Sequence, residues 1–137
     1  MAARVLDSWA LMAFFEDEPA AAEVERYLDE AESTGNELLL TAINWGEVYY
    51  SVMRAASQAE AERIAAEMGT MPVQIVPAGE DLRLTRQAAV YKATRRMSYA
   101  DCFAAAAARL HGLELLTGDP EFRQVAGEIA IHWLPTR

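Results

Sequence analysis

Residues 98–117, SYADCFAAAAARLHGLELLT, decide the fold of this chain. They predict a helix that begins after Ser98 and ends at Gly112, followed at once by the apolar strand 113–117. Five consecutive alanines at 104–108 have side chains small enough to let the helix lie close against a sheet. Asp101 is an acid near the start of this otherwise buried segment. A buried helix that leads into a buried strand is typical of an α/β protein.

Outward from this segment, apolar strands alternate with helices along the whole chain. Strands are predicted at 4–7, 37–41, 72–77, 113–117 and 129–134. Helices are predicted at 8–15, 19–34 (opening with Pro19), 42–56, 57–69, 79–96 and 99–111, and from Asp119 onward. Apolar strands separated by helices indicate a parallel sheet covered on both faces. We therefore expect residues 1–137 to form a single domain, a three-layer α/β/α sandwich with a central parallel sheet of four to five strands.

The composition is that of a globular protein, with 53% hydrophobic and 24% charged residues. No apolar run approaches the roughly 20 residues that span a bilayer, and the first residues lack the apolar stretch of a signal peptide. The single cysteine, Cys102, has no partner for an internal disulfide and is interpreted as a small buried side chain. These features predict a reduced, cytoplasmic protein with no membrane contact.

Four acidic side chains stand near strand ends or helix starts. Asp7 ends the first strand and Asp119 follows the fourth. Glu47 lies in the helix after the second strand, and Asp101 lies at the head of its own helix. Ligands of parallel sheets bind beyond the carboxyl ends of the strands, where the following helices begin. The acids are therefore candidates for one site at this edge.

Helix capping is an alternative explanation for three of these acids, and the pattern leaves it open. Ser98 and Asp101 match a capping box, with serine at the N-cap and an acid at the third helical position. Asp119 precedes a proline, as an N-cap residue often does. Asp7 or Ser8 could cap the first short helix.

Glu47 does not fit the capping explanation, because it lies about two turns into its helix. Its neighbours three and four positions away are Ile43, Asn44, Tyr50 and Ser51, so no cation offers it an ion pair within the helix. It lies opposite the main apolar stripe of the helix, on a second, partly apolar side. This position favours a cleft or an interface, with an ordinary exposed glutamate as the alternative.

Convergence of these carboxylates would require a cation. Two carboxylates about 4 Å apart repel by about 4 kcal/mol at an effective dielectric of 20, whereas a helix cap contributes about 1 kcal/mol. Mg²⁺ and Mn²⁺ prefer carboxylate oxygens as ligands. The net charge of −9 argues against a protein that binds nucleic acid mainly by neutralising phosphates. The charge is compatible with an enzyme that holds phosphates through metal ions, or with a protein that has a basic partner.

Four segments, in this order and at this spacing, resemble the motifs of PIN-domain ribonucleases. They are VLDS (5–8), NWGEV (44–48), SYADCFAAAAA (98–108) and LLTGDPEF (115–122). Within that family the chain is most similar to the VapC toxins of type II toxin–antitoxin pairs, and the similarity extends from Val5 to Trp133. The resemblance implies a parallel sheet in a three-layer sandwich, in agreement with the alternation of strands and helices.

The resemblance also implies a catalytic site. The acidic quartet of the family falls on Asp7, Glu47, Asp101 and Asp119. Family members are implied to bind Mg²⁺ or Mn²⁺ there and to hydrolyse an RNA phosphodiester. Asp7 and Asp101 would be the strongest metal ligands, and Glu47 and Asp119 would complete the pocket, partly through water.

Two hydroxyls and both histidines lie outside this quartet. Ser8 and Thr117 flank it, either to orient a ligand or water or to satisfy backbone groups. His111 ends a helix, where a cation favours the helix dipole, and His132 lies in the last strand. Both histidines are interpreted as structural, because the implied chemistry needs no histidine base.

Three partners are implied as well: RNA as the substrate, a second copy in a homodimer, and a cognate antitoxin. The antitoxin would lay a C-terminal helix into a groove and place an arginine in the acidic pocket. Six aromatic residues either line that groove or belong to the core: Trp9, Phe14, Phe15, Trp45, Tyr49 and Tyr50. Five basic residues either attract RNA or form an ordinary solvated face: Arg83, Arg86, Lys92, Arg95 and Arg96.

Two other functions stay open. One is a housekeeping PIN-domain nuclease of RNA processing with no antitoxin, and the other is a non-catalytic α/β binding module whose acids are caps. A haloacid-dehalogenase-like phosphatase is a poor match, because Trp9 stands where that class needs a second acid. A receiver domain is a poor match, because the third strand lacks a following phosphoacceptor aspartate and the only lysine, Lys92, lies in a helix.

Overall fold

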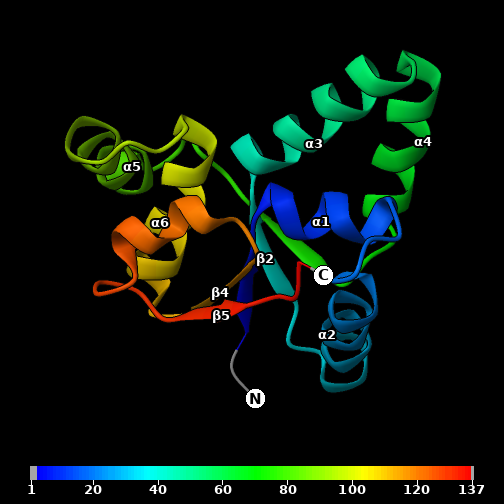
Figure 1. The fold of residues 1–137 in the computed structure, drawn as a ribbon, viewed down its shortest axis with the longest axis horizontal. Helices are drawn as coiled ribbons and strands as arrows, with labels where there is room; N and C mark the ends of the chain where they lie inside the picture. Colours follow the sequence, from blue (N-terminus) through cyan, green and yellow to red (C-terminus); the bar gives the residue numbers. More distant parts are fainter. Residues whose placement is uncertain (1–2, 137) are drawn as a thin grey trace.

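The computed structural model describes residues 3–136, and its centre is a sheet of five parallel strands in the order β3-β2-β1-β4-β5. The strands are β1 (Arg4–Leu6), β2 (Leu38–Thr41), β3 (Val73–Val76), β4 (Glu114–Thr117) and β5 (Ile131–Trp133). The chain winds outward from β1 to β3, then crosses to the other side of β1 for β4 and β5 (Figure 1). The predicted parallel sheet is confirmed, and its direction of winding reverses between β1 and β4.

Helices cover both faces of the sheet, which confirms the three-layer sandwich (Figure 1). One face carries α1 (Ser8–Phe15), α2 (Ala21–Thr34), α3 (Ala42–Ala55) and α4 (Gln58–Met68). The other carries α5 (Leu82–Thr94), α6 (Tyr99–His111) and the 3-10 helix η1 (Pro120–Val125). Alternate strand residues enter the two cores, as Val5 and Leu6 of β1 do. Strand residues therefore reach both layers.

Helix α6 is the most deeply buried helix of the described chain. Its five consecutive alanines are at most 1% exposed, and Cys102 is fully buried beside them. α6 packs beside α5 and shares a core with Val5 of β1 and Leu115 of β4. The expected close packing of the alanine helix on the sheet is confirmed, as is the interpretation of Cys102 as a small buried side chain.

Two helices begin two or three residues later than predicted. α5 begins at Leu82, not at Gly79, because Asp81 caps it. α2 begins at Ala21, not at Pro19. The backbone N–H of Ala21 donates to the carbonyl of Glu18 at 2.8 Å, so residues 18–21 close a turn with Pro19 at its second position. Proline is favoured at that position because its φ angle is already fixed near the required value. Among residues 3–136, no helix combines the length and the apolar character needed to cross a bilayer.

Candidate active site

Three helices begin at the carboxyl edge of the sheet with the caps that their sequences predict. Asp7 caps α1, and its Oδ1 accepts a hydrogen bond from the Ala10 backbone N–H at 2.8 Å. Asp119 caps η1 in the same way, by accepting from the Glu121 N–H at 2.9 Å. Ser98 caps α6 by accepting from the Asp101 N–H at 3.2 Å. The capping predictions for these residues are confirmed, and at α1 the cap is Asp7 rather than Ser8.

The second half of the predicted capping box at α6 is wrong. The Ser98 backbone N–H donates to the carboxylate of Glu121 in η1, and not to Asp101. The reciprocal bond of a capping box is made by Glu or Gln, and the aspartate side chain is one methylene shorter. Because Glu121 satisfies this N–H from another element, the Asp101 side chain is left to line the hollow beside it.

A single hollow of about 280 Å³ brings the acids together. It is lined by Ser8, Trp9, Met12, Glu47, Ser51, Ser98, Asp101, Asp119 and Glu121. Asp7 is fully buried next to it, close enough for its charge to act on Asp101. The structure therefore places all four predicted acids in or beside one hollow, where the winding of the sheet reverses and ligands of such sheets bind.

Burial and nearby negative charges favour the protonated form of two of these carboxyls. Burial raises the pKa of Asp7 to about 7, against hydrogen bonds from Thr117 and Ala10 that lower it. Burial, followed by the charges of Asp119 and Asp7, raises the pKa of Asp101 to about 9. Each shift is large because a charge removed from water and set beside other negative charges is destabilised. A cation at this position would relieve both effects.

The two flanking hydroxyls bond to protein groups. The Thr117 hydroxyl donates to Asp7 Oδ2 at 2.5 Å and accepts from the Asp119 backbone N–H at 3.0 Å. The Ser8 hydroxyl donates to the carbonyl of Asn44 at 3.2 Å. Both residues thus satisfy and orient groups of the protein, as one of the two alternatives for them predicted, and Thr117 joins two of the acids directly.

The wall of the hollow depends on a close approach at Gly118. A Cβ atom at this position would lie 2.3 Å from Cη2 of Trp9, well inside contact distance. Glycine therefore lets the β4–η1 connection lie against the Trp9 ring, which lines the hollow beside Asp119. This contact fixes the distance between the start of η1 and the first turn of α1.

Comparison with known families shows to which family the chain belongs. A family model of the PIN domain matches residues 4–128. The chain belongs to the PIN-domain family. A search of curated protein sequences found no significant match.

Solved structures share the fold of this PIN domain at low sequence identity. The DNA-bound VapBC of Salmonella typhimurium aligns with a TM-score of 0.72 at 14% identity, over 96% of this chain and 98% of that one. Mycobacterium tuberculosis VapC20, described as a sarcin-ricin loop cleaving toxin, gives 0.70 at 17%, over 97% and 100%. A toxin–antitoxin complex from Klebsiella pneumoniae gives 0.65 at 18%, over 95% and 96%. These likenesses support the three-layer fold.

Glu121 is the acid of this PIN domain that sequence reasoning missed. Asp101, Asp119 and Glu121 each offer a carboxylate oxygen, and these three oxygens lie within 4.8 Å of one another. An all-oxygen, negatively charged donor set suits Mg²⁺ or Mn²⁺ and does not suit soft metals. The available signal was the position of Glu121 two residues after Asp119 in LLTGDPEF, which places it in the first turn of η1.

The histidines lie away from the acidic hollow of the PIN domain. His132 Nε2 lies 2.6 Å from Glu23 Oε1 of α2, and its ring meets Tyr27 edge-on. His111 is the last residue of α6, at the helix end farthest from Asp101. Neither histidine lines the hollow, in keeping with their interpretation as structural residues.

Two of the five residues of the predicted basic group form ion pairs. Arg83 pairs with Asp81 at 2.7 Å, and Arg95 pairs with Glu128. Recognition of RNA by this group stays a prediction. Most of the predicted aromatic set packs against the core of α1–α4, as one alternative held: Trp9, Phe14, Phe15, Trp45 and Tyr49.

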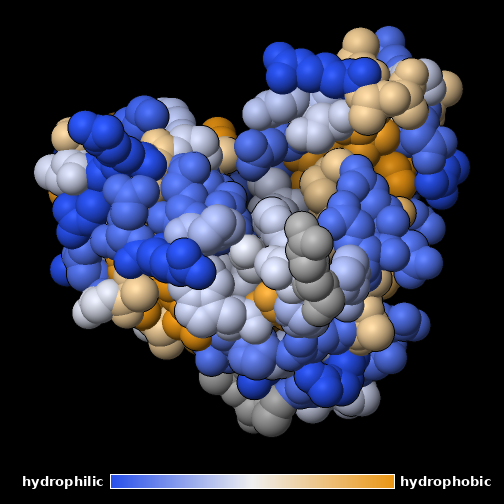
Figure 2. Space-filling view, viewed as in Figure 1, coloured by the Kyte–Doolittle hydropathy of each residue, from blue (hydrophilic) through white to orange (hydrophobic). Residues whose placement is uncertain are grey.

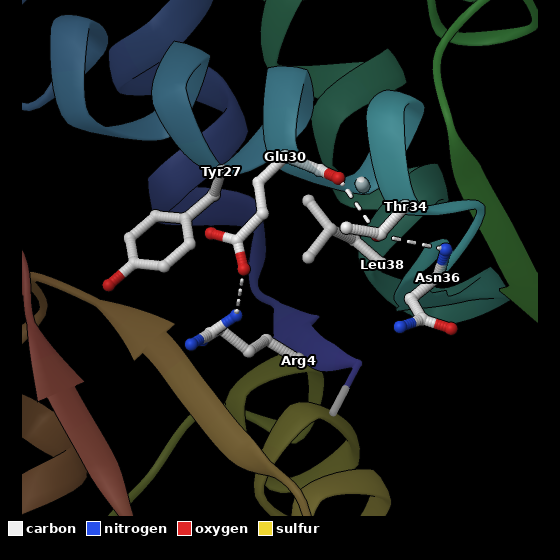
Figure 3. A pocket seen from close by; sticks show the side chains of 7 residues that line it. Arg4, Tyr27, Glu30, Thr34, Asn36 and Leu38 are labelled. Atoms are coloured by element: carbon white, nitrogen blue, oxygen red, sulfur yellow. Dashed lines mark hydrogen bonds and ion pairs between the residues drawn. The ribbon is translucent and has the colours of Figure 1, made fainter. Parts of the chain in front are cut away.

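A much smaller hollow lies near the opposite end of β1, beside α2 (Figure 3). Arg4 Nη1 lies 3.5 Å from Glu30 Oε1 there, and the Arg4 guanidinium covers the ring of Tyr27. Its volume is about 10 Å³, room for about one water molecule. This hollow is too small for a substrate.

Proposed function

We propose that residues 1–137 form one PIN-like domain that hydrolyses RNA phosphodiester bonds with Mg²⁺ or Mn²⁺, as the toxin of a type II toxin–antitoxin pair. The observation that carries this proposal is the gathering of Asp7, Glu47, Asp101 and Asp119 at one hollow of about 280 Å³. Their mutual repulsion has no cation of the protein to offset it at the hollow, whose lining contains no lysine or arginine among the described residues. A bound dication would supply that charge.

The side chains of the site have separable roles in this proposal. Asp101, Asp119 and Glu121 present the compact set of oxygens that would hold the ion, with Glu47 across the hollow. The buried Asp7 carboxylate would add negative charge beside the hollow, and Thr117 fixes its orientation. When bound, the ion would acidify water and stabilise negative charge on the scissile phosphate. Catalytic and metal-binding roles are therefore proposed for Asp7, Glu47, Asp101 and Asp119, and Glu121 is added to the proposed metal ligands.

A hydrophobic groove supports an antitoxin as the partner. Figure 2 shows hydrophobic surface gathered between α1 and the α3–α4 pair. The groove there, about 170 Å³, is lined by Met12, Phe15, Glu16, Val52, Ala55, Ala56, Glu60, Arg63 and Ile64. Met12 lines both this groove and the acidic hollow. An amphipathic helix in the groove could therefore extend a guanidinium to the carboxylates, where a fixed cation is favourable.

Two other parts of the proposal extend the resemblance to VapC proteins: a homodimer and a cytoplasmic location. The Klebsiella pneumoniae structure that shares the fold is described as a toxin–antitoxin complex, which supports a partner for this chain. A PIN-domain nuclease without an antitoxin is the second candidate, and the groove beside the hollow favours the toxin over it.

The decisive experiment compares the purified protein with variants of single acids. Total cellular RNA is incubated with each protein and Mg²⁺, and the new RNA ends are mapped. We expect defined new ends with the wild type and at least a hundredfold loss with Asp101→Asn or Asp7→Asn, because each removes a charge from the site. Asp29→Asn, on the exposed side of α2, makes the same chemical change elsewhere and should retain full activity.

Two outcomes would reject the nuclease. One is cleavage by Asp101→Asn at the rate of the wild type. The other is equal Mn²⁺ affinity in these two proteins, which would leave a non-catalytic binding module whose acids serve as caps.

A further inference from the structure

Asn44 is a fully buried polar residue that uses all the hydrogen-bonding groups of its side chain. Its Nδ2 donates to the Ser8 hydroxyl and to the Ala100 carbonyl, both at 3.1 Å. Its Oδ1 accepts from the hydroxyl of Thr41 at 2.5 Å. A buried amide bonded in this way is stabilising, whereas a partly bonded one would be costly.

The partners fix the orientation of the amide. The Ala100 carbonyl can only accept a hydrogen bond, so Nδ2 must face it. The Thr41 hydroxyl accepts from the Asn44 backbone N–H at 3.1 Å, so its own proton is free for Asn44 Oδ1. No residue with only acceptors or only donors could replace asparagine here without losing a bond.

These bonds join the three helices that carry three of the acids. Ser8 directly follows Asp7 in α1, and Ala100 directly precedes Asp101 in α6. Asn44 itself lies in the first turn of α3, three residues before Glu47 on the same side of the helix. One amide therefore contacts the immediate chain neighbour of two acids and lies one turn from a third.

We propose that Asn44 is a positioning residue, which holds α1, α3 and α6 together so that Asp7, Glu47 and Asp101 face one hollow. This inference rests on the proposed function and adds to it a residue that does not itself contact the metal or the RNA. Repulsion among the acids acts to separate these helices, and each helix carries at least one of them. The neutral amide ties the helices together without adding charge to the site.

The test separates positioning from general stability by measuring Mn²⁺ affinity and thermal unfolding on the same proteins. Asn44→Asp keeps the shape but loses both donors, and Asn44→Leu keeps the volume but loses every side-chain bond. Val48→Ala is the matched control, since Val48 is also fully buried in α3 but faces the apolar core. We expect Val48→Ala to lower the unfolding temperature and to leave the hydrogen bonds of Asn44 in place.

We expect both Asn44 variants to bind Mn²⁺ at least tenfold more weakly than the wild type. Loss of a residue that supports metal ligands by hydrogen bonding typically weakens metal binding by about 10- to 100-fold. Val48→Ala should bind within twofold of the wild type. Where an Asn44 variant does not fold, Ser8→Ala removes only the bonds to α1 and should still weaken binding severalfold.

Folded Asn44 variants that bind Mn²⁺ within twofold of the wild type would overturn the positioning role. So would a loss of affinity in Val48→Ala equal to theirs. In either case the proposed nuclease stands as long as the wild type binds Mn²⁺ and Asp101→Asn does not. Failure of the wild type itself to bind Mn²⁺ would instead reject the proposed function.

Discussion

At the scale of single residues, Thr117 shows how one hydroxyl can serve two acids. It is fully buried at the end of β4, and its donation to Asp7 Oδ2 favours the charged form of that carboxyl. Its acceptance from the Asp119 N–H fixes the chain where η1 begins. The side chain therefore lowers the pKa of Asp7, which burial raises, and also positions Asp119.

We expect Thr117→Val to lower the free energy of unfolding by about 1–3 kcal/mol, because it leaves buried polar groups without partners. The pKa of Asp7 should rise further, so Mn²⁺ binding at pH 7 should weaken. Thr117→Ser keeps the hydroxyl and is the control, and it should bind like the wild type. Urea unfolding and Mn²⁺ titration measure the two effects. Equal behaviour of the valine and serine variants would contradict this role.

At the scale of elements, the start of α6 depends on two residues with different tasks. Ser98 caps the helix, and Glu121 satisfies the Ser98 N–H while its second carboxylate oxygen is free for the hollow. The same glutamate thus takes part in helix capping and in the compact group with Asp101 and Asp119. Stability and ion binding at this helix start should respond separately to substitution.

We expect Ser98→Ala to lower the free energy of unfolding by about 1 kcal/mol while it leaves all the acids in place. Glu121→Gln keeps an oxygen that can accept from the Ser98 N–H but removes one charge. This variant should unfold at the same temperature as the wild type or higher, and it should bind Mn²⁺ more weakly. Calorimetry of unfolding measures the loss of stability, and calorimetry of metal binding measures the loss of Mn²⁺ affinity. A larger loss of metal affinity in Ser98→Ala than in Glu121→Gln would show that the tasks are not divided in this way.

The elements also show how far the sequence can be interpreted alone. The caps at Asp7, Ser98 and Asp119 could be predicted because a cap bonds within three residues of itself. The bond between Glu121 and Ser98 could not, because it joins residues 23 positions apart. Contacts of that kind depend on how the layers pack, and a local pattern does not contain this information.

Asn44 illustrates the same limit. In the sequence it is only an uncharged neighbour of Glu47, and its importance follows from the meeting of α1, α3 and α6 around it. The alternation of strands and helices, in contrast, predicts the parallel sheet and its three layers, because burial of both sheet faces determines the pattern of every strand. The fold was therefore more predictable than the hydrogen bonds between helices that position the acids.

At the scale of the whole molecule, burial of acids in a chain of net charge −9 links stability to pH. The pKa values of Asp7 and Asp101 in the folded protein, about 7 and about 9, lie above the ordinary value of 3.8. Between pH 4 and pH 9 the folded state therefore holds protons that the unfolded state has lost. The contribution of these two groups to the free energy of unfolding is fully present below about pH 4, and it decreases as the pH rises toward 9.

We expect the metal-free protein to lose stability from pH 5 to pH 9, and Mn²⁺ to stabilise it more strongly at the upper end, where fewer protons compete with the ion. The double variant Asp7→Asn, Asp101→Asn should have a flatter profile and little response to Mn²⁺. Thermal unfolding across this range, with and without Mn²⁺, measures both. A stability that rises with pH in the metal-free wild type, or a Mn²⁺ effect independent of pH, would contradict the assignment.

The reversal of winding between β1 and β4 has a consequence during synthesis on the ribosome. The acids follow β1, β2 and β4 in the chain, and α6 with Asp101 comes just before β4. A nascent polypeptide that has emerged only as far as β3 carries two of them, Asp7 and Glu47, with no neighbouring strand on the other side of β1. The complete acidic centre can thus assemble only late in translation, which would delay the proposed activity against RNA near the site where the protein itself is being made.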